Sequence, residues 1–261
     1  MKDVQNISDD RGIDIQNVGV SDVHLPFLIK TKAGSFQSVL ANINLTVDLP
    51  KEYKGTHMSR FIEILSEWSQ KPVSSQEMEL ILADTIHKLN AEYAQMEIQF
   101  KYFIEKSAPV SGLKSLLDVD CSFSAKLTKG KPLDFTLGVN VPFTSLCPCS
   151  KEISEHGAHN QRGLMKVKIK YQSGKFIWIE DLVTLMEDQG SCPVYPLLKR
   201  EDEKYVTEYA YENAKFVEDV LRDLVLSLRQ QTYISWFEIQ CENYESIHNH
   251  SAYARHIEHV K

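Results

Sequence analysis

The densest group of chemically reactive side chains lies between residues 145 and 163. It contains two imidazoles and the thiols of Cys147 and Cys149, which are separated only by a proline. Thiolates and imidazoles are common ligands of zinc and similar metal ions. Two thiols so close in sequence seldom reach one metal ion without backbone strain. We therefore expect one thiol to bind a metal and the other to lie near the reacting atom.

A histidine downstream could complete part of this site. His159 follows Cys147 by twelve positions, which is enough chain to fold back on to the same metal ion. On spacing alone, an alternative of about equal weight is that both thiols are buried and the histidine is a solvated loop residue.

A carboxylate is often the third protein ligand of a catalytic metal site, which keeps one position open. The candidates stand between residues 199 and 208, and the residues alone do not distinguish four of them: Glu201, Asp202, Glu203 and Glu208. The alternative is a solvated charged run that leads into a helix.

Two further features near the C-terminus could contribute to a site. His248 and His250 stand two residues apart, and such residues face the same way on an extended chain. Either could bind a metal or act as a general acid or base near neutral pH, although loop histidines are more often simply exposed.

Glu218 lies near the apolar stripe of a predicted helix. It is either a surface charge or a buried anchor that accepts two parallel N–H bonds from a planar ligand such as a guanine edge.

Hydrophobic periodicity predicts the elements that position these residues. Alternating apolar and polar residues predict strands over 23–30, 35–47, 96–105, 113–127, 134–143, 164–171, 233–241 and 253–260. Apolar residues at helical spacing predict helices over 58–70, 74–89, 179–188 and 205–230. The reactive stretch therefore lies in an enlarged loop between two strands of the second half.

Each half of the chain has the predicted order β-β-α-α-β-β, without a repeat of individual residues. Two such tandem modules, with antiparallel sheets and helices on one face, form an α+β fold. We expect residues 1–20 to form a flexible arm, residues 21–130 the first module and residues 131–261 the second, which carries most candidate site residues. Completing a closed barrel would cover the exposed strand edges of the sheets, and this favours assembly of several chains into an oligomer.

The composition excludes several classes of protein. Of the 261 residues, 43% are hydrophobic, which is enough for a packed core and argues against disorder. The formal net charge of −7 argues against nucleic-acid binding but permits an anionic small molecule in a local basic pocket. No apolar run approaches the roughly 20 residues of a membrane helix, and no secretory signal is present. The lack of a signal segment leads us to expect a cytoplasmic protein, and five cysteines in so long a chain do not suggest a disulfide framework.

The motifs around the candidate residues resemble those of the prokaryotic GTP cyclohydrolase type IB family, from about residue 18 to the end of the chain. Several long motifs in the same order make the resemblance specific. They are SLCPCSKEIS (145–154), GAHNQRG (157–163), PVYPLLKR (193–200), DEKYVTE (202–208), YENAKFVED (211–219) and SIHNHSAYA (246–254).

The resemblance implies the tunnelling fold, with two modules in one chain and a homotetramer whose active sites lie between subunits. It implies the conversion of GTP and water to 7,8-dihydroneopterin triphosphate and formate. That reaction opens folate biosynthesis and, in many bacteria, queuosine biosynthesis. It also implies a divalent metal cofactor, and zinc, manganese and iron(II) all suit the ligand types.

Carried over residue by residue, the resemblance implies that Cys147, His159 and Glu203 bind the metal. Glu203 is preferred to Glu201 because Glu201 replaces a proline of the family pattern, which marks its position as variable.

The resemblance also implies roles around the metal. Cys149 and His248 correspond to proton-handling groups, and Glu218 corresponds to the purine anchor, with His250 assisting at the substrate. Cationic residues beside the motifs are candidates for binding the triphosphate: Lys151, Arg162, Lys199 and Arg200.

Other functions compete with this interpretation. The nitrile reductase of the queuosine pathway has the same fold, but the context of its nucleophilic cysteine is absent from this sequence. A non-catalytic metal-binding or assembly protein would use the same residues to close a site with four protein ligands and no exchangeable water. A related archaeal branch stops at a cyclic phosphate product and uses iron(II).

Overall fold

The computed structural model of the chain describes residues 10–172 and 174–260. The strands are β1 (Ile15–Lys30), β2 (Phe36–Leu49), β3 (Pro72–Val73), β4 (Tyr93–Ser107), β5 (Lys114–Thr128), β6 (Asp134–Leu146), β7 (Asn160–Tyr171), β8 (Cys192–Pro193), β9 (Ile234–Asn243) and β10 (Ala252–His259). The helices are α1 (Met58–Trp68), α2 (Ser75–Leu89), α3 (Pro148–Ile153), α4 (Ile179–Glu187), α5 (Arg200–Glu212) and α6 (Val217–Arg229). None of the helices in these residues is long and apolar enough to cross a membrane.

The strands pair in the order β10-β9-β7-β6-β5-β4-β2-β1-β3, and β8 pairs with β6 off this path. The pairs β1–β2, β2–β4, β7–β9 and β9–β10 are antiparallel, whereas the short β3 runs parallel to β1. In each half of the chain two long strands precede the longer helices and two follow them. The predicted α+β fold with antiparallel sheets is therefore confirmed.

The chain forms two compact units, and each of them consists of two separate stretches of the sequence. One unit comprises the chain up to Lys101 together with Ser122–Leu137. The other comprises Tyr102–Cys121 and the chain from Gly138 onward. The expected modules, 21–130 and 131–261, divide the chain once, whereas β4, β5 and β6 each contribute residues to both units.

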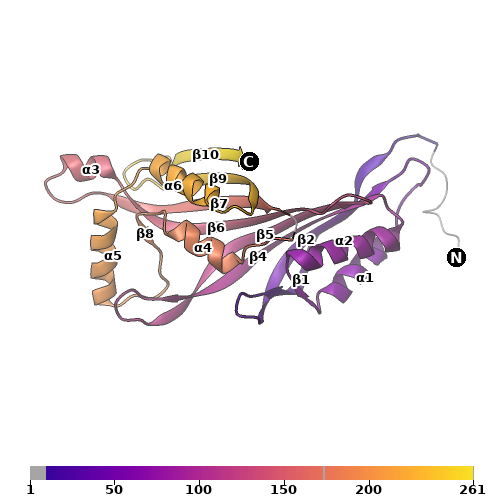
Figure 1. Cartoon of the computed structure of the whole chain (residues 1–261), viewed down its shortest axis with the longest axis horizontal. Helices are drawn as coiled ribbons and strands as arrows, with labels where there is room; N and C mark the ends of the chain where they lie inside the picture. The colour runs from indigo at the N-terminus through magenta and orange to yellow at the C-terminus, as the bar shows by residue number, and fades with distance from the viewer. Residues whose placement is uncertain (1–9, 173, 261) are drawn as a thin grey trace. The chain divides into compact units, whose positions relative to one another are not determined.

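In the first unit, α1 packs against β1 and α2 packs against β2 (Figure 1). Alternate residues of β2 form the buried face of this unit, and Ala41, Ile43 and Leu45 are completely inaccessible to solvent. Period-two burial is the reason why the strand could be predicted from its apolar residues.

Helix α2 begins where the sequence predicts it, with a capping box. The Ser74 hydroxyl accepts a hydrogen bond from the Gln76 N–H, and the Glu77 carboxylate accepts the Ser74 N–H at 2.8 Å. The helix ends at Asn90, which takes the left-handed conformation with φ of 52°. Both ends are therefore determined by local residue chemistry.

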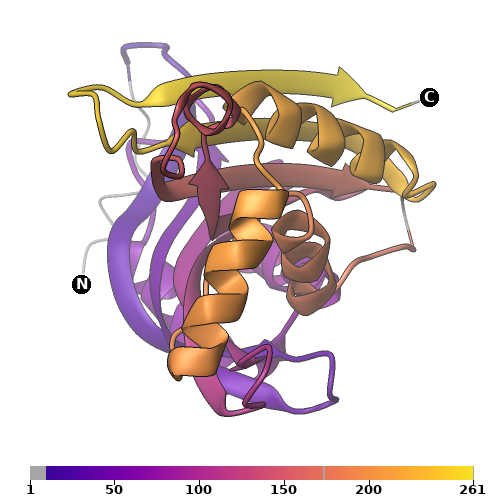
Figure 2. The same ribbon diagram turned by 90° about the vertical axis from the view of Figure 1, so that its left-hand side faces the viewer.

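In the second unit, α6 packs against β9 and β10, as Figure 2 also shows. Its buried side includes Val220, Leu224 and Leu228, and the facing strand β9 buries Phe237 and Ile239. The stripe predicted for this helix is thus its core-facing side.

The single long helix predicted over 205–230 is wrong, because the chain breaks into α5 and α6, which run in different directions (Figure 2). The break begins at Asn213, where α5 ends and the side-chain amide bonds the Tyr209 carbonyl at 2.7 Å. The Lys215 N–H then donates to the Leu146 carbonyl at 3.2 Å instead of continuing a helix. The Asp219 carboxylate accepts the Phe216 N–H at 3.1 Å and starts α6.

The expected flexible arm over 1–20 is wrong for its last six residues, because β1 begins at Ile15 and pairs there with Leu49. Residues 1–9 lie outside the described residues. The first residues of β1 are exposed, so they lack the apolar alternation that would reveal a strand. Gly19 lies so close to the partner strand that a Cβ atom would come within 2.1 Å of the Leu45 carbonyl oxygen.

We predict that Ser74→Ala lowers the free energy of unfolding by about 1 kcal/mol, because the helix loses its cap. Urea denaturation followed by circular dichroism measures this change. The matched control is Ser75→Ala, one residue inside the helix, where alanine is a good helix former and little change is expected. Equal losses in the two variants would contradict the capping role.

Candidate active site

The enlarged loop between β6 and β7 closes on itself at its base. The Cys147 N–H donates to the His159 carbonyl at 3.1 Å. Ser150 joins the same two residues, because its hydroxyl donates to the Cys147 carbonyl at 3.1 Å and accepts the His159 N–H at 3.2 Å. Cys147 and His159, predicted to act together, are therefore neighbours in the folded chain.

The two thiols of the Cys-Pro-Cys motif lie in different surroundings. Cys147 is the half-buried N-cap of α3, and its sulfur accepts the Ser150 N–H at 3.5 Å. Pro148 occupies the first helical position, where it needs no N–H donor. Cys149 follows on α3 and is exposed. This difference is consistent with separate roles for the two thiols.

The other three cysteines are buried, as expected for small apolar side chains. Burial raises the pKa of Cys192 to about 11 and that of Cys241 to about 12, and it also raises the pKa of Cys121. A raised pKa disfavours the thiolate, so these three buried thiols are poor candidates for nucleophilic or metal-binding chemistry.

The ring of His159 is held through one of its nitrogens. Nδ1 lies 2.9 Å from the Gln161 side-chain oxygen, 3.5 Å from the Ser246 hydroxyl and 4.0 Å from a Glu245 carboxylate oxygen. Behind Gln161 the buried Ser145 hydroxyl accepts hydrogen bonds from Gln161 at 3.5 Å and from Asn243 at 2.8 Å.

The partners of His159 carry no signal that is recognisable in the sequence. Gln161 is part of a quoted motif, but a glutamine carries no reactive signal of its own. Glu245 stands three residues before His248, and the turn that brings it back to β7 is not predictable from its spacing. In this turn the Tyr244 N–H donates to the Arg162 carbonyl at 3.0 Å.

The candidate carboxylates of α5 separate into different classes. Asp202 is fully buried and accepts hydrogen bonds from the N–H groups of Val110, Ser111 and Lys199 at 2.8 to 2.9 Å and from the Ser111 hydroxyl at 2.7 Å. Burial alone would raise the pKa of Asp202, but these hydrogen bonds outweigh it and hold the pKa well below its usual range. Asp202 is therefore a structural anchor.

Glu203, the carboxylate expected to bind metal, is exposed in the first turn of α5. Its neighbour Asp202 fixes that turn, so the position of Glu203 depends on the anchor beside it. Glu201 and Glu208 are also exposed on the same helix.

Within residues 10–172 and 174–260, no three His, Cys, Asp or Glu side chains gather closely enough to hold a metal ion. The loop brings Cys147 and His159 together, and a thiol with an imidazole suits zinc, manganese or iron(II). The loop thus brings together two residues of the expected ligand set, and Glu203 is not gathered with them.

Glu218 lies at the second position of α6 and is exposed, not inside a long helix as predicted. The helix break explains this difference. The bond from Lys215 to the Leu146 carbonyl ties the start of α6 to the residue that precedes Cys147. The break therefore brings the segment that carries Glu218 toward the reactive loop.

His248 and His250 form a stacked pair, although they lie in a run of bends between β9 and β10 and not on the extended chain for which their spacing predicts a shared face. Their ring centroids lie 5.0 Å apart with 17° between the ring planes, and both side chains are exposed. Both belong to the segment that also carries Glu245 and Ser246.

Of the four cations considered for triphosphate binding, Lys151 has protein partners. Its ammonium group donates to the Tyr211 carbonyl and lies 4.3 Å from the centroid of the Tyr211 ring. This contact holds α3 against the end of α5. Arg162, Lys199 and Arg200 are exposed.

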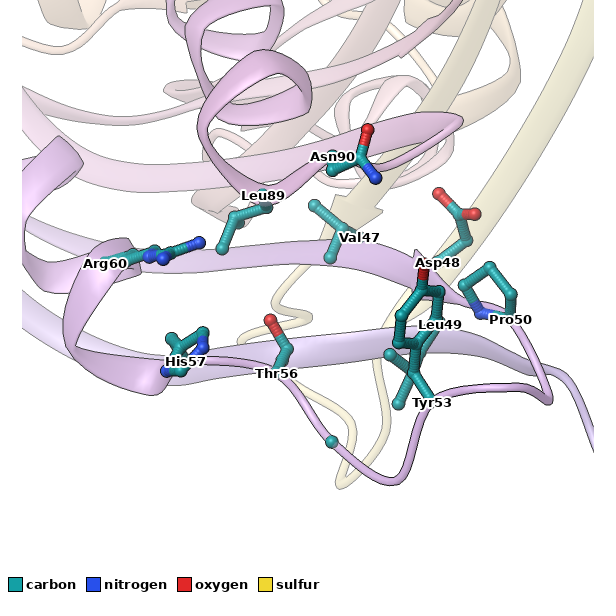
Figure 3. A pocket seen from close by; sticks show the side chains of 11 residues that line it. Val47, Asp48, Leu49, Pro50, Tyr53, Thr56, His57, Arg60, Leu89 and Asn90 are labelled. Carbon is teal, nitrogen blue, oxygen red and sulfur yellow. The ribbon is translucent and has the colours of Figure 1, made fainter. Parts of the chain in front are cut away.

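A pocket of about 150 Å³ lies in the first unit, where the end of β2, the start of α1 and the end of α2 meet (Figure 3). Figure 3 shows Arg60 and His57 on one side of it and Asp48 with Tyr53 on the other. The residues predicted for the active site do not line this pocket. Its lining contains one arginine and one aspartate, whose formal charges are opposite.

Comparisons with known proteins identify relatives along nearly the whole chain. A family described as "Type I GTP cyclohydrolase folE2" matches residues 1–254. The GTP cyclohydrolase FolE2 of Geobacter sp. (strain M21) is 53% identical over 254 residues, which cover 97% of this chain and 93% of the relative. That of Geotalea uraniireducens (strain Rf4) is 54% identical, with 97% and 92% covered.

Solved structures show the same fold in distant proteins. The uricase from Arthrobacter globiformis matches with a TM-score of 0.58 at 6% identity, covering 94% of both chains. The urate oxidase from Bacillus sp. TB-90 matches with a TM-score of 0.54 at 9% identity, covering 94% of this chain and 99% of that one. At such identities the likeness concerns the fold alone, and it confirms the expected tunnelling fold.

We predict that Asp202→Asn lowers the midpoint of thermal unfolding by several degrees at pH 7, because an amide cannot accept all four hydrogen bonds. Since the folded-state pKa is depressed, the carboxylate stabilises the fold above its unfolded pKa of about 3.9. The difference from wild type should therefore shrink as pH falls below about 4. Differential scanning fluorimetry at several pH values measures it, with the exposed Glu201→Gln as control. A difference that is independent of pH would contradict the anchoring role.

Proposed function

The chain belongs to the type I GTP cyclohydrolase folE2 family and is a GTP cyclohydrolase, and from this premise we propose a metal-dependent reaction. In it, GTP and water yield 7,8-dihydroneopterin triphosphate and formate, the first step toward folate and queuosine precursors. The observation that carries the proposal is the identity of about half of all residues with curated members over 254 residues. The closed loop that joins Cys147 to His159 supports it independently.

Cys147, His159 and Glu203 would hold the divalent metal. A thiolate, an imidazole and a carboxylate form a mixed ligand set that suits zinc, manganese or iron(II). When bound, the metal would supply activated water for attack at C8 of the purine. The exposed position of Glu203 leaves its carboxylate available to an ion that is held first by the loop.

Glu218 would bind the guanine base. A carboxylate can accept two parallel N–H bonds from the guanine edge, and the N-terminus of α6 stabilises its negative charge. Adenine presents a different edge and would leave the carboxylate unpaired, so the same contact would reject it. The exposure of Glu218 makes this contact accessible to a ligand.

His248, His250 and Cys149 would handle protons and contact the substrate. His248 would protonate the imidazole nitrogen of the purine and assist ring opening. Stacking on His250, at 5.0 Å between ring centroids, limits the orientations that His248 can adopt. Cys149 is exposed one residue beyond the α3 proline, beside the thiol that would bind the metal.

The active enzyme would be a homotetramer with sites between subunits. Strand β10 is at one end of the strand order and pairs with β9 alone along that path. A strand edge of this kind favours pairing with another chain. The separation of Glu203 from the Cys147–His159 loop is also consistent with a site that is completed on assembly.

We predict that purified protein stripped of metal loses GTP turnover and that one of zinc, manganese or iron(II) restores it. Formate and the fluorescent oxidised pterin report the two products separately. Formate with a neopterin triphosphate would support the proposed reaction and identify an active metal. Metal bound by four protein ligands, with neither product formed, would instead favour a structural role.

We predict that Glu218→Gln abolishes detectable GTP binding in calorimetry while metal content is unchanged. The amide presents an N–H group where a second carboxylate oxygen should accept a hydrogen bond, so one bond is lost and one clash is gained. Glu212→Gln, an exposed carboxylate at the end of α5, is the control and should bind GTP normally. Unchanged GTP affinity in Glu218→Gln would eliminate the purine-anchor role.

A further inference from the structure

Three side-chain oxygen atoms lie near Nδ1 of the His159 imidazole. The Gln161 oxygen at 2.9 Å, the Ser246 hydroxyl at 3.5 Å and the Glu245 carboxylate at 4.0 Å all face Nδ1. Two of these groups, an amide oxygen and a carboxylate, only accept hydrogen bonds. A proton on Nδ1 is therefore favoured over a lone pair there.

The orientation of Gln161 is itself supported from within the protein. Its side-chain NH₂ group donates to the Ser145 hydroxyl at 3.5 Å, and that oxygen also accepts the Asn243 amide at 2.8 Å. Ser145, Gln161 and Asn243 are 1%, 8% and 3% exposed, so water cannot readily replace these contacts.

The glutamine would favour the opposite tautomer if its amide were reversed. Its NH₂ group would then face Nδ1, and the ring proton would be driven to Nε2. The Glu245 carboxylate opposes this arrangement, because a negative charge beside Nδ1 favours a proton on that nitrogen. The Ser246 hydroxyl, which donates to the Gln161 oxygen at 3.5 Å, opposes it as well.

We propose that Gln161 and Glu245 are positioning residues that keep the proton of His159 on Nδ1 and so leave the lone pair of Nε2 available to a metal ion. The tautomer of a histidine ligand is set by the hydrogen bond that its other nitrogen makes. The inference rests on the proposed function for its metal, but its first consequence concerns the metal-free protein.

The same contacts connect two parts of the proposed site. Glu245 and Ser246 precede the His248–His250 pair on one short segment, and the Glu245 N–H donates to the Asn243 carbonyl at 3.0 Å. Contacts with the His159 ring therefore anchor the segment that carries the proton-handling histidines.

The test measures the tautomer directly. In metal-free protein labelled with ¹⁵N-histidine, the side-chain shifts of His159 are recorded at alkaline pH and assigned by comparison with His159→Ala. Wild type should be predominantly protonated on Nδ1. Gln161→Leu should shift the population toward protonation on Nε2, whereas Gln161→Glu, which keeps an acceptor oxygen, should retain the Nδ1 proton.

Metal affinity provides the second readout. In a competition assay with a zinc chelator, Gln161→Leu should raise the dissociation constant roughly 10- to 100-fold, the usual effect of losing a partner of a metal ligand. Gln161→Glu should bind zinc within a few-fold of wild type. The control is Gln240→Leu, since the Gln240 amide donates to Glu238 and not to the His159 network.

Two results would overturn the inference: a wild-type ring protonated on Nε2, or a Gln161→Leu variant with unchanged tautomer and unchanged zinc affinity. If Gln161→Leu does not fold, Glu245→Gln gives the same test, with a weaker shift in the same direction expected. Wild-type protein that has the Nδ1 tautomer but no metal-dependent GTP turnover would contradict the proposed function and leave the positioning role intact.

Discussion

The closed loop between β6 and β7 determines where the reactive groups of the second unit lie. Its base is a backbone hydrogen bond between Cys147 and His159, and the Ser150 hydroxyl joins both residues. Backbone contacts of this kind do not depend on the ligand that the side chains bind. The backbones of Cys147 and His159 are therefore brought together by folding, before any ligand binds.

Carboxylates at the third position of a helix recur in this chain and do more than start helices. Glu77, Asp202 and Asp219 each accept the N–H of the residue that precedes their helix. Asp202 also accepts hydrogen bonds from the loop between β4 and β5, so one buried side chain fixes both α5 and that loop. Because Asp202 fixes the first turn of α5, it also fixes the backbone position of the exposed Glu203 beside it. The buried Asp202, which is structural, and the exposed Glu203, which is a candidate functional residue, are thus adjacent in the sequence.

The sequence was sufficient wherever one residue pattern determines one element, as in the alternation of β2 or the cap of α2. It failed where a distant partner decides the outcome. Helical spacing alone does not separate α5 from α6, and the contact of Lys215 with Leu146, which lies far away in the sequence, helps to fix the break between them. The spacing argument for His248 and His250 assumed an extended chain, whereas the segment bends, and it could not indicate that Glu245 turns back to face His159. Reactive residue types identify candidates, whereas their partners are ordinary amides and hydroxyls without a distinctive pattern.

The division of β4, β5 and β6 between the two compact units has a consequence for how the protein could be dissected. A cut in the turn after β5 would leave each fragment with parts of strands whose remaining residues belong to the other unit. Neither fragment would contain the full set of backbone partners that its sheet requires. Neither fragment would therefore contain one complete compact unit, despite the modular order of elements. Insertions between its modules would be tolerated only where the long strands are not interrupted.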